Sequence, residues 1–239
     1  MTPPATSPPA GDLRPGAMEA RFLAVVSHEL RTPLTTIASF TESMAADEDM
    51  APAERSLALS AVRRNTDRML TLVEDLMLLS RLQTGDLELT LTPVDPAGIV
   101  RAAADALAKH EPHTAATLDL PAGPPVRGDA ALLHLLAYAM VGTVAAGAAD
   151  RSATVHAEAG GAGWTVTVSA VQAEQLTDEL LMAGTLALPE PPHRRRSTAL
   201  WMLLATAIAT RHGGQVDLTY DPAVGAGAVA FLPYTPVPD

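Results

Sequence analysis

The chain has 239 residues, which is room for one large or two small domains. Its formal net charge of −11 argues against a nucleic-acid binder held by phosphate contacts. The absence of cysteine excludes disulfides and thiolate metal sites. Residues 1–16 are rich in Pro, Ala and Thr and show no apolar period, so we expect a disordered leader there. They lack a charged segment followed by an apolar core, and no signal peptide is predicted.

The next stretch, from about residue 18 to about residue 46, is predicted to be one long helix. Its apolar residues recur at steps of three and four, the spacing of a helix-bundle seam. His28 lies between two seam positions, so we expect its ring to point away from the seam towards solvent. Pro33 lacks an N–H and clashes with the carbonyl of Glu29, at a cost of ~3 kcal/mol, so we expect a kinked or opened backbone there. Thr32 lies one turn after His28 on the same face. The predicted seam consists of Leu23, Val26, Leu30, Pro33, Ile37, Phe40 and Met44.

A second long helix is predicted from about residue 54 to residue 83, after a turn that contains Pro52. Its apolar residues cover more than one narrow stripe, and a helical hairpin cannot bury two such faces alone. Two hairpins paired in a four-helix bundle do bury them, so the pattern predicts a homodimer. The apolar residues of this helix include Leu59, Val62, Met69, Leu72, Val73, Leu76, Leu79 and Leu82.

From Leu87 onwards the pattern changes to short strands between helices. We expect a strand over 87–93, a helix opened by Asp95 and Pro96, a strand over 117–120, and a hairpin over 153–158 and 164–169. Further helices are predicted at about 174–186 and 197–212, followed by a closing hairpin over 216–220 and 228–233. Helices on one face of such a mixed sheet give an α/β sandwich.

One uncharged run, between Asp129 and Asp150, is long enough to cross a bilayer. It contains His134, Tyr138 and Thr143 and lacks flanking basic anchors. We therefore expect a buried helix, no membrane span and a cytoplasmic protein.

The run Ser-His-Glu-Leu-Arg-Thr-Pro-Leu at 27–34 resembles the H box of two-component sensor histidine kinases. This resemblance implies that His28 carries the phosphoryl group, that Glu29 orients the ring or accepts its proton, and that Thr32 positions water for dephosphorylation of a regulator. The implied partner is the receiver domain of a response regulator. On this basis 17–86 is assigned to a dimerisation and phosphotransfer hairpin.

The second half resembles the ATP-binding (Bergerat) domain of the same family, and 87–239 is assigned to it. The matching landmarks are Leu-Asp-Leu-Pro at 118–121, Gly-Asp at 128–129, Arg-His-Gly-Gly at 211–214, and Gly-Ala-Gly with Phe-Leu-Pro near the end. The expected fold is therefore a dimeric helical hairpin followed by a Bergerat-like α/β sandwich.

Three nucleotide motifs of that family are missing. The asparagines of the N box fall on Ala139 and Thr143, the first glycine box begins at Ala170, and glycines of the second fall on Ala199 and Trp201. Alanine cannot hold a Mg²⁺ shell, and a tryptophan fills the space where backbone would approach a phosphate. We therefore expect no bound cofactor and no metal site, with ATP and Mg²⁺ entering only if this site works despite its sequence.

Three functions stay open, and with them whether the protein is an enzyme. The first is a dimeric pseudokinase in which His28 exchanges phosphate with a response regulator, or dephosphorylates it, without ATP. The second is an active ATP-dependent sensor histidine kinase with divergent boxes. The third is a non-catalytic protein that binds a response regulator through the helical hairpin.

Overall fold

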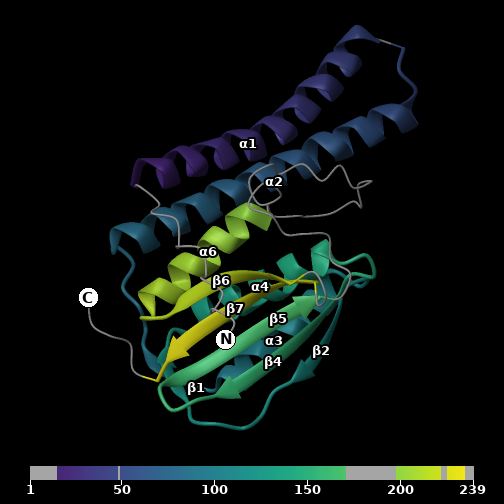
Figure 1. Cartoon of the computed structure of the whole chain (residues 1–239). Helices are drawn as coiled ribbons and strands as arrows, with labels where there is room; N and C mark the ends of the chain where they lie inside the picture. The colour runs from purple at the N-terminus through teal and green to yellow at the C-terminus, as the bar shows by residue number, and fades with distance from the viewer. Residues whose placement is uncertain (1–14, 48, 171–197, 222–224, 235–239) are drawn as a thin grey trace, which may run out of the picture.

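The structure is a computed structural model that describes residues 15–47, 49–170, 198–221 and 225–234 (Figure 1). It begins with a hairpin of two long helices, α1 (Pro15–Ala46) and α2 (Pro52–Thr84). The last two residues of the predicted leader, 15 and 16, lie in α1. α2 ends at Gly85, whose φ of +79° is left-handed backbone that glycine adopts without a steric penalty.

The two helices pack along a seam that includes polar side chains. The sequence predicted a kinked or opened backbone at Pro33. The structure has one α-helix through Pro33, so the backbone is not opened there. Pro33 is buried, while Leu30 and Ile37 are half-buried and Phe40 is exposed. On α2 the buried residues follow heptad steps and include an aspartate: Ala58, Ala61, Leu72, Asp75, Leu79 and Leu82.

An α/β sheet domain follows the hairpin. Its main sheet has the strand order β2-β4-β5-β7-β6, in which β2 and β4 are parallel and the other pairs are antiparallel. The strands of this sheet are β2 (Ala115–Asp119), β4 (Ser152–Ala159), β5 (Gly163–Ala170), β6 (Gln215–Asp221) and β7 (Gly225–Pro233). Two short strands, β1 (Thr92–Val94) and β3 (Val126–Gly128), pair separately.

Three helices cover one face of the main sheet, as the sequence predicted: α3 (Pro96–His110), α4 (Ala130–Gly147) and α6 (Thr198–Arg211) (Figure 1). Two of them begin with an aspartate cap. The carboxylate of Asp95 accepts from the amides of Ala97 and Gly98, and that of Asp129 accepts from Ala131 and Leu132. These side chains satisfy amides that have no partner inside the helix.

The strand predicted over 87–93 is wrong for residues 87–91. The backbone of this linker is bonded by side chains of the sheet domain instead of by a neighbouring strand. Arg211 Nη2 donates to the carbonyl of Leu87 at 3.0 Å, and Arg127 Nη2 donates to that of Leu91 at 3.2 Å. The amide of Thr90 donates to Asp129 Oδ2 at 3.1 Å. Because these groups already have partners, the linker does not need a strand ladder.

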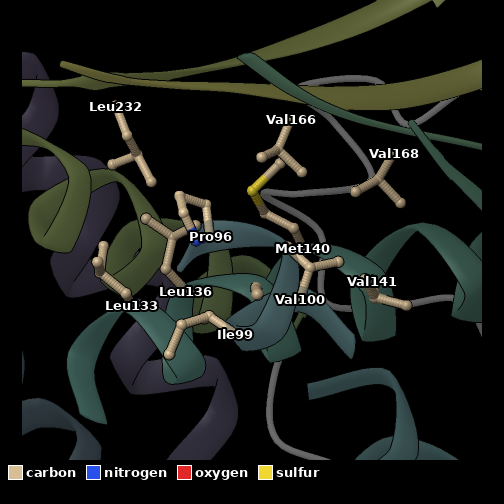
Figure 2. Close-up of a pocket in the computed structure, with 11 residues that line it drawn as sticks. Pro96, Ile99, Val100, Leu133, Leu136, Met140, Val141, Val166, Val168 and Leu232 are labelled. Atoms are coloured by element: carbon tan, nitrogen blue, oxygen red, sulfur yellow. The ribbon is translucent and has the colours of Figure 1, made fainter. Parts of the chain in front are cut away.

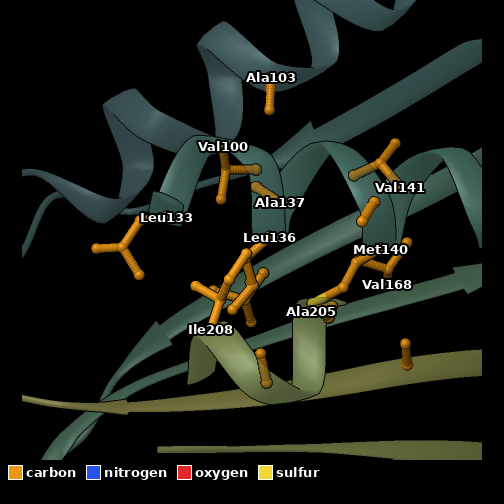
Figure 3. Close-up of a cluster of buried hydrophobic side chains, with 14 of the residues drawn as sticks. Val100, Ala103, Leu133, Leu136, Ala137, Met140, Val141, Val168, Ala205 and Ile208 are labelled. Carbon is orange, nitrogen blue, oxygen red and sulfur yellow. The ribbon is translucent and has the colours of Figure 1, made fainter. Parts of the chain in front are cut away.

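One hydrophobic core extends from the hairpin into the sheet domain. Leu72, Leu79 and Leu82 of α2 belong to the same buried cluster as α4, α6 and the inner face of the sheet. α6 contacts α2 on one side and β6 and β7 on the other (Figure 1). Figure 3 shows the centre of this core, where Val100, Leu136, Met140 and Ile208 converge from three helices.

Among the helices that the structure describes, α4 alone is long and apolar enough to cross a membrane, and eleven of its eighteen residues are buried within this fold. The core helix of a globular protein can be equally long and apolar. Two other predictions lie outside the described residues: the leader over 1–14 and the helix at 174–186.

Candidate functional site

His28 lies on α1, in the part of the helix that packs against α2. Its ring is half-buried in the isolated chain, so it is less exposed than the sequence predicted. The ring makes no hydrogen bond to any described residue. The nearby Thr32 is exposed, and its hydroxyl donates to the backbone carbonyl of His28 at 3.4 Å, a common arrangement for threonine inside a helix.

Glu29 does not lie on the solvated face of α1. Its side chain is only 8 % exposed, and its Oε2 accepts a hydrogen bond from Arg68 Nη2 of α2 at 3.1 Å. The Arg68 side chain is 31 % exposed, and its Nε is buried without a hydrogen-bond partner. Glu29 is thus committed to the helix–helix seam, and no hydrogen bond joins its carboxylate to the ring of His28 in the described part of the chain.

Sequence reasoning missed Arg68, although a signal was present. The buried residues Leu72, Leu79 and Leu82 define a heptad stripe on α2, and continuing that stripe towards the N-terminus reaches Arg68. A charged residue at a seam position needs a partner across the seam. Glu29 is that partner.

The positions matched to the family's nucleotide motifs are buried wherever the structure describes their side chains. Ala139 and Thr143 of α4 are each 1 % exposed, and Ala170 at the end of β5 is buried. The hydroxyl of Thr143 is buried without a hydrogen-bond partner. The side chain of Ala199 lies outside the described part of the structure.

Trp201 of α6 fills the space beside α4. A Cβ added to Gly142 would lie 2.5 Å from Trp201 Cζ3, so the indole rests directly on the glycine. Tyr138, one turn earlier on α4, meets the indole edge-on with ring centroids 5.1 Å apart. Trp201 itself is 7 % exposed.

A small cavity lies between α3, α4 and the sheet (Figure 2). Its volume of about 20 Å³ is room for one water, but its lining offers no polar side chain to bind one. It is a packing defect of the core, far too small for a nucleotide. The lining residues are Pro96, Ile99, Val100, Leu133, Leu136, Ala137, Met140, Val141, Val166, Val168 and Leu232.

The buried His212 joins the end of α6 to the start of α4. Its Nδ1–H donates to the carbonyl of Ile208 at 2.7 Å, and its Nε2 accepts from the amide of Asp129 at 3.0 Å. Burial lowers the pKa of His212, because the charged imidazolium would lose its hydration. Since both ring nitrogens are used by a neutral imidazole, His212 is a structural connector.

The other histidines show no metal-ligand arrangement. His134 stacks near Tyr138 with centroids 6.4 Å apart, and His156 Nδ1 lies 2.8 Å from Asp119 Oδ2 on the sheet. His110 and His113 are exposed near the end of α3. Among the residues that the structure describes, no group of three or more His, Asp or Glu side chains is placed to hold a metal ion.

Residues 18–85, which comprise most of the hairpin with His28 on its first helix, match the family model of the His Kinase A (phospho-acceptor) domain. The hairpin is therefore a His Kinase A (phospho-acceptor) domain, and the chain is similar to two-component sensor histidine kinases. Two curated relatives of this chain come from Mycobacterium tuberculosis. It is 45% identical over 132 residues to the probable sensor histidine kinase TcrY, and 36% identical over 117 residues to the sensor histidine kinase TrcS.

These alignments cover 52% and 48% of the chain, and 27% and 23% of TcrY and TrcS. The chain therefore spans about a quarter of the length of these relatives. Among solved structures, the Acinetobacter baumannii histidine kinase AdeS has a TM-score of 0.66 at 18% identity, covering 87% of this chain and 98% of AdeS. The histidine kinase ThkA, solved in complex with the response regulator protein TrrA, has a TM-score of 0.59 at 17% identity, covering 92% of this chain and 62% of that one. These likenesses support the fold alone: a helical hairpin followed by an α/β sheet domain.

Proposed function

We propose that this histidine kinase accepts and returns a phosphoryl group at His28 without using ATP of its own. Its phosphoryl donor or acceptor is the aspartate of a response-regulator receiver domain. The observation that carries the proposal is the packing of Trp201 on Gly142 and Tyr138, because the indole fills space between α6 and α4 that a nucleotide would need. We also propose that the protein acts in the cytoplasm.

The residues at the matched positions do not fit Mg²⁺. A Mg²⁺ ion takes oxygen ligands in a near-octahedral shell and keeps several waters. Ala139 and Ala170 supply no side-chain oxygen, and the hydroxyl of Thr143 is shut inside the core. The proposed chemistry therefore uses neither ATP nor a metal ion bound by this chain.

The proposed chemistry is a phosphoryl exchange at the imidazole. The unprotonated ring nitrogen of His28 forms a bond to phosphorus while the P–O bond to the regulator's aspartate breaks. The electron pair of that bond leaves with the carboxylate, and the proton on the other ring nitrogen passes to a base or to water. The regulator's own acidic pocket supplies the metal for this step.

Two predicted roles remain part of the proposal. Glu29 orients the ring or accepts its proton, which requires that it leave Arg68. Thr32 positions a water for dephosphorylation of the regulator, which requires that its hydroxyl leave the carbonyl of His28. The bond of Thr32 is a single neutral hydrogen bond at 3.4 Å, whereas the bond of Glu29 at 3.1 Å is part of an ion pair, so the change at Thr32 is the smaller of the two.

The proposal includes a homodimer formed through the hairpin. In the isolated chain the hairpin leaves large apolar side chains in solvent on both helices. Pairing two hairpins in a four-helix bundle buries such faces. The exposed residues are Leu34, Phe40, Leu57, Leu59, Leu70, Val73 and Met77.

The test is phosphate labelling with two donors. The chain is incubated with radiolabelled ATP and Mg²⁺, and separately with response-regulator receiver domains that carry labelled phosphate. We expect no label from ATP and a label from at least one receiver, lost in His28→Gln but kept in His113→Gln, which changes an exposed histidine outside the hairpin. Label from ATP at His28 would establish an active kinase. Binding to a receiver with no transfer in either direction would establish a regulator-binding protein.

A further inference from the structure

The ion pair between Glu29 and Arg68 joins α1 to α2 at the residue next to the phosphoacceptor position. On a helix of 3.6 residues per turn, neighbouring side chains leave the axis about 100° apart. Glu29 therefore points into the seam while His28 keeps part of its ring in solvent. Any help that Glu29 gives to the ring is limited by its bond to Arg68.

We propose that Arg68 is a positioning residue that holds Glu29 away from His28 and so keeps the phosphoacceptor in a slow state. This inference rests on the proposed role of His28. When the pair breaks, Glu29 becomes free to bond the ring and take its proton. A residue of α2, distant in sequence from the H box, thus controls the reactivity of α1.

The geometry of the Glu29–Arg68 ion pair allows it to separate easily. Glu29 and Arg68 share one hydrogen bond of 3.1 Å rather than the two of a bidentate pair, and Arg68 Nε has no partner in the seam. Glu29 is carried by α1 and Arg68 by α2, so a shift of one helix along the other separates them. Such shifts at helix interfaces are a common form of switching.

When Glu29 is released from Arg68, we expect its carboxylate to move towards solvent. Pro33 and Leu72, each one turn further along its helix, are buried, so the side chains next to the pair in that direction are apolar. An unpaired carboxylate is costly in such surroundings and moves to water. Its immediate neighbour His28 is half-buried, and the His28 ring has no hydrogen bond to any residue that the structure describes.

Phosphoramidate tests this without ATP and without a regulator. A ring nitrogen of His28 forms a bond to phosphorus, the P–N bond of the donor breaks, and ammonia leaves with the electron pair. The proton on the second ring nitrogen passes to Glu29. The initial rate at which the peptide containing His28 gains phosphate, followed by mass spectrometry, measures the step separately from the other six histidines.

The central variant is Arg68→Met, and its matched control is Arg64→Met, which removes the same charge from an exposed position one turn earlier on α2. We expect Arg68→Met to be phosphorylated about tenfold faster than the unaltered chain, since proton transfer by a positioned side chain is worth at least that much. Arg64→Met should match the unaltered chain. Arg68→Lys keeps the charge and should stay slow.

The double variant Glu29→Gln with Arg68→Met removes both charges, and we expect it to lose the gain. A double variant as fast as Arg68→Met, or Arg68→Met no faster than Arg64→Met, overturns the inference while the proposed function stands. Absence of phosphate on His28 in every variant overturns the proposed function itself. If circular dichroism shows Arg68→Met unfolded, Arg68→Gln, which keeps hydrogen-bond donors but no charge, is judged by the same rates.

Discussion

Gly142 is the position where the filling of the α4–α6 space by Trp201 can be measured. Replacing it with alanine has two opposite effects on the free energy of unfolding. Alanine in a helix interior is favoured over glycine by about 1 kcal/mol. The new Cβ would lie 2.5 Å from Trp201 Cζ3, well inside van der Waals contact, and such overpacking costs roughly 1–3 kcal/mol.

The indole has little room to move, because the ring of Tyr138 also packs against it, with ring centroids 5.1 Å apart. We therefore expect Gly142→Ala to lower the free energy of unfolding by about 0–2 kcal/mol in the unaltered chain, the difference between these two effects. In a Trp201→Leu background no atom remains at the Cζ3 position. There the same substitution should raise stability by about 1 kcal/mol.

Urea unfolding followed by far-ultraviolet circular dichroism measures all four proteins, and avoids tryptophan fluorescence, which Trp201→Leu alters. The reversal of sign between the two backgrounds is the expected result, with a coupling of about 1–3 kcal/mol. If Gly142→Ala is equally stabilising in both, the indole does not rest on α4, and the main support for an ATP-independent function is lost.

Three further predictions follow from other contacts. His212 titrates at a lower pH in the folded chain than in the unfolded chain, so the unfolded state binds more protons below about pH 6.5. Stability should therefore fall as the pH drops through the unfolded pKa, by at most about 1.4 kcal/mol per unit from this group, and His212→Gln should lose that component in urea titrations across pH 5–7.5. Asp129→Ala removes the cap of α4 and the acceptor for the amide of Thr90, so its melting should show a loss of about 1–2 kcal/mol, larger than that of Asp95→Ala, which removes a cap alone. Val73→Glu places a charge on the exposed apolar face of α2, and sedimentation velocity should show a lower dimer fraction with unchanged helix content.

The parts of the fold that depend on local pattern could be predicted from the sequence. Asp95 followed by Pro96 fixed the start of α3, and the alternation in β4 and β5 predicted that hairpin. The linker over 87–91 alternates in the same way, yet its backbone is bonded by Arg127, Asp129 and Arg211. Those partners are distant in sequence, and an alternating pattern carries no information about them.

The same distinction holds for the candidate site. The H-box motif identified His28, and the match to the phospho-acceptor domain covers it. The direction in which Glu29 points depends on which residue of α2 lies opposite, and this is set by how the two helices pack. Pro33 illustrates the limit further, because α1 continues as an α-helix through this buried proline where the residue alone predicts a kinked or opened backbone.

The leucines of α2 that enter the core of the sheet domain have a consequence for how the protein can be divided. Leu72, Leu79 and Leu82 are covered by the same cluster that contains Leu204 and Ile208 of α6. Cutting the chain near Gly85 would expose apolar surface on both fragments, so we expect each isolated fragment to aggregate. A chimera that joins two relatives at this boundary should keep a well-packed core only if the α2 leucines and the α6 residues of this cluster come from the same relative.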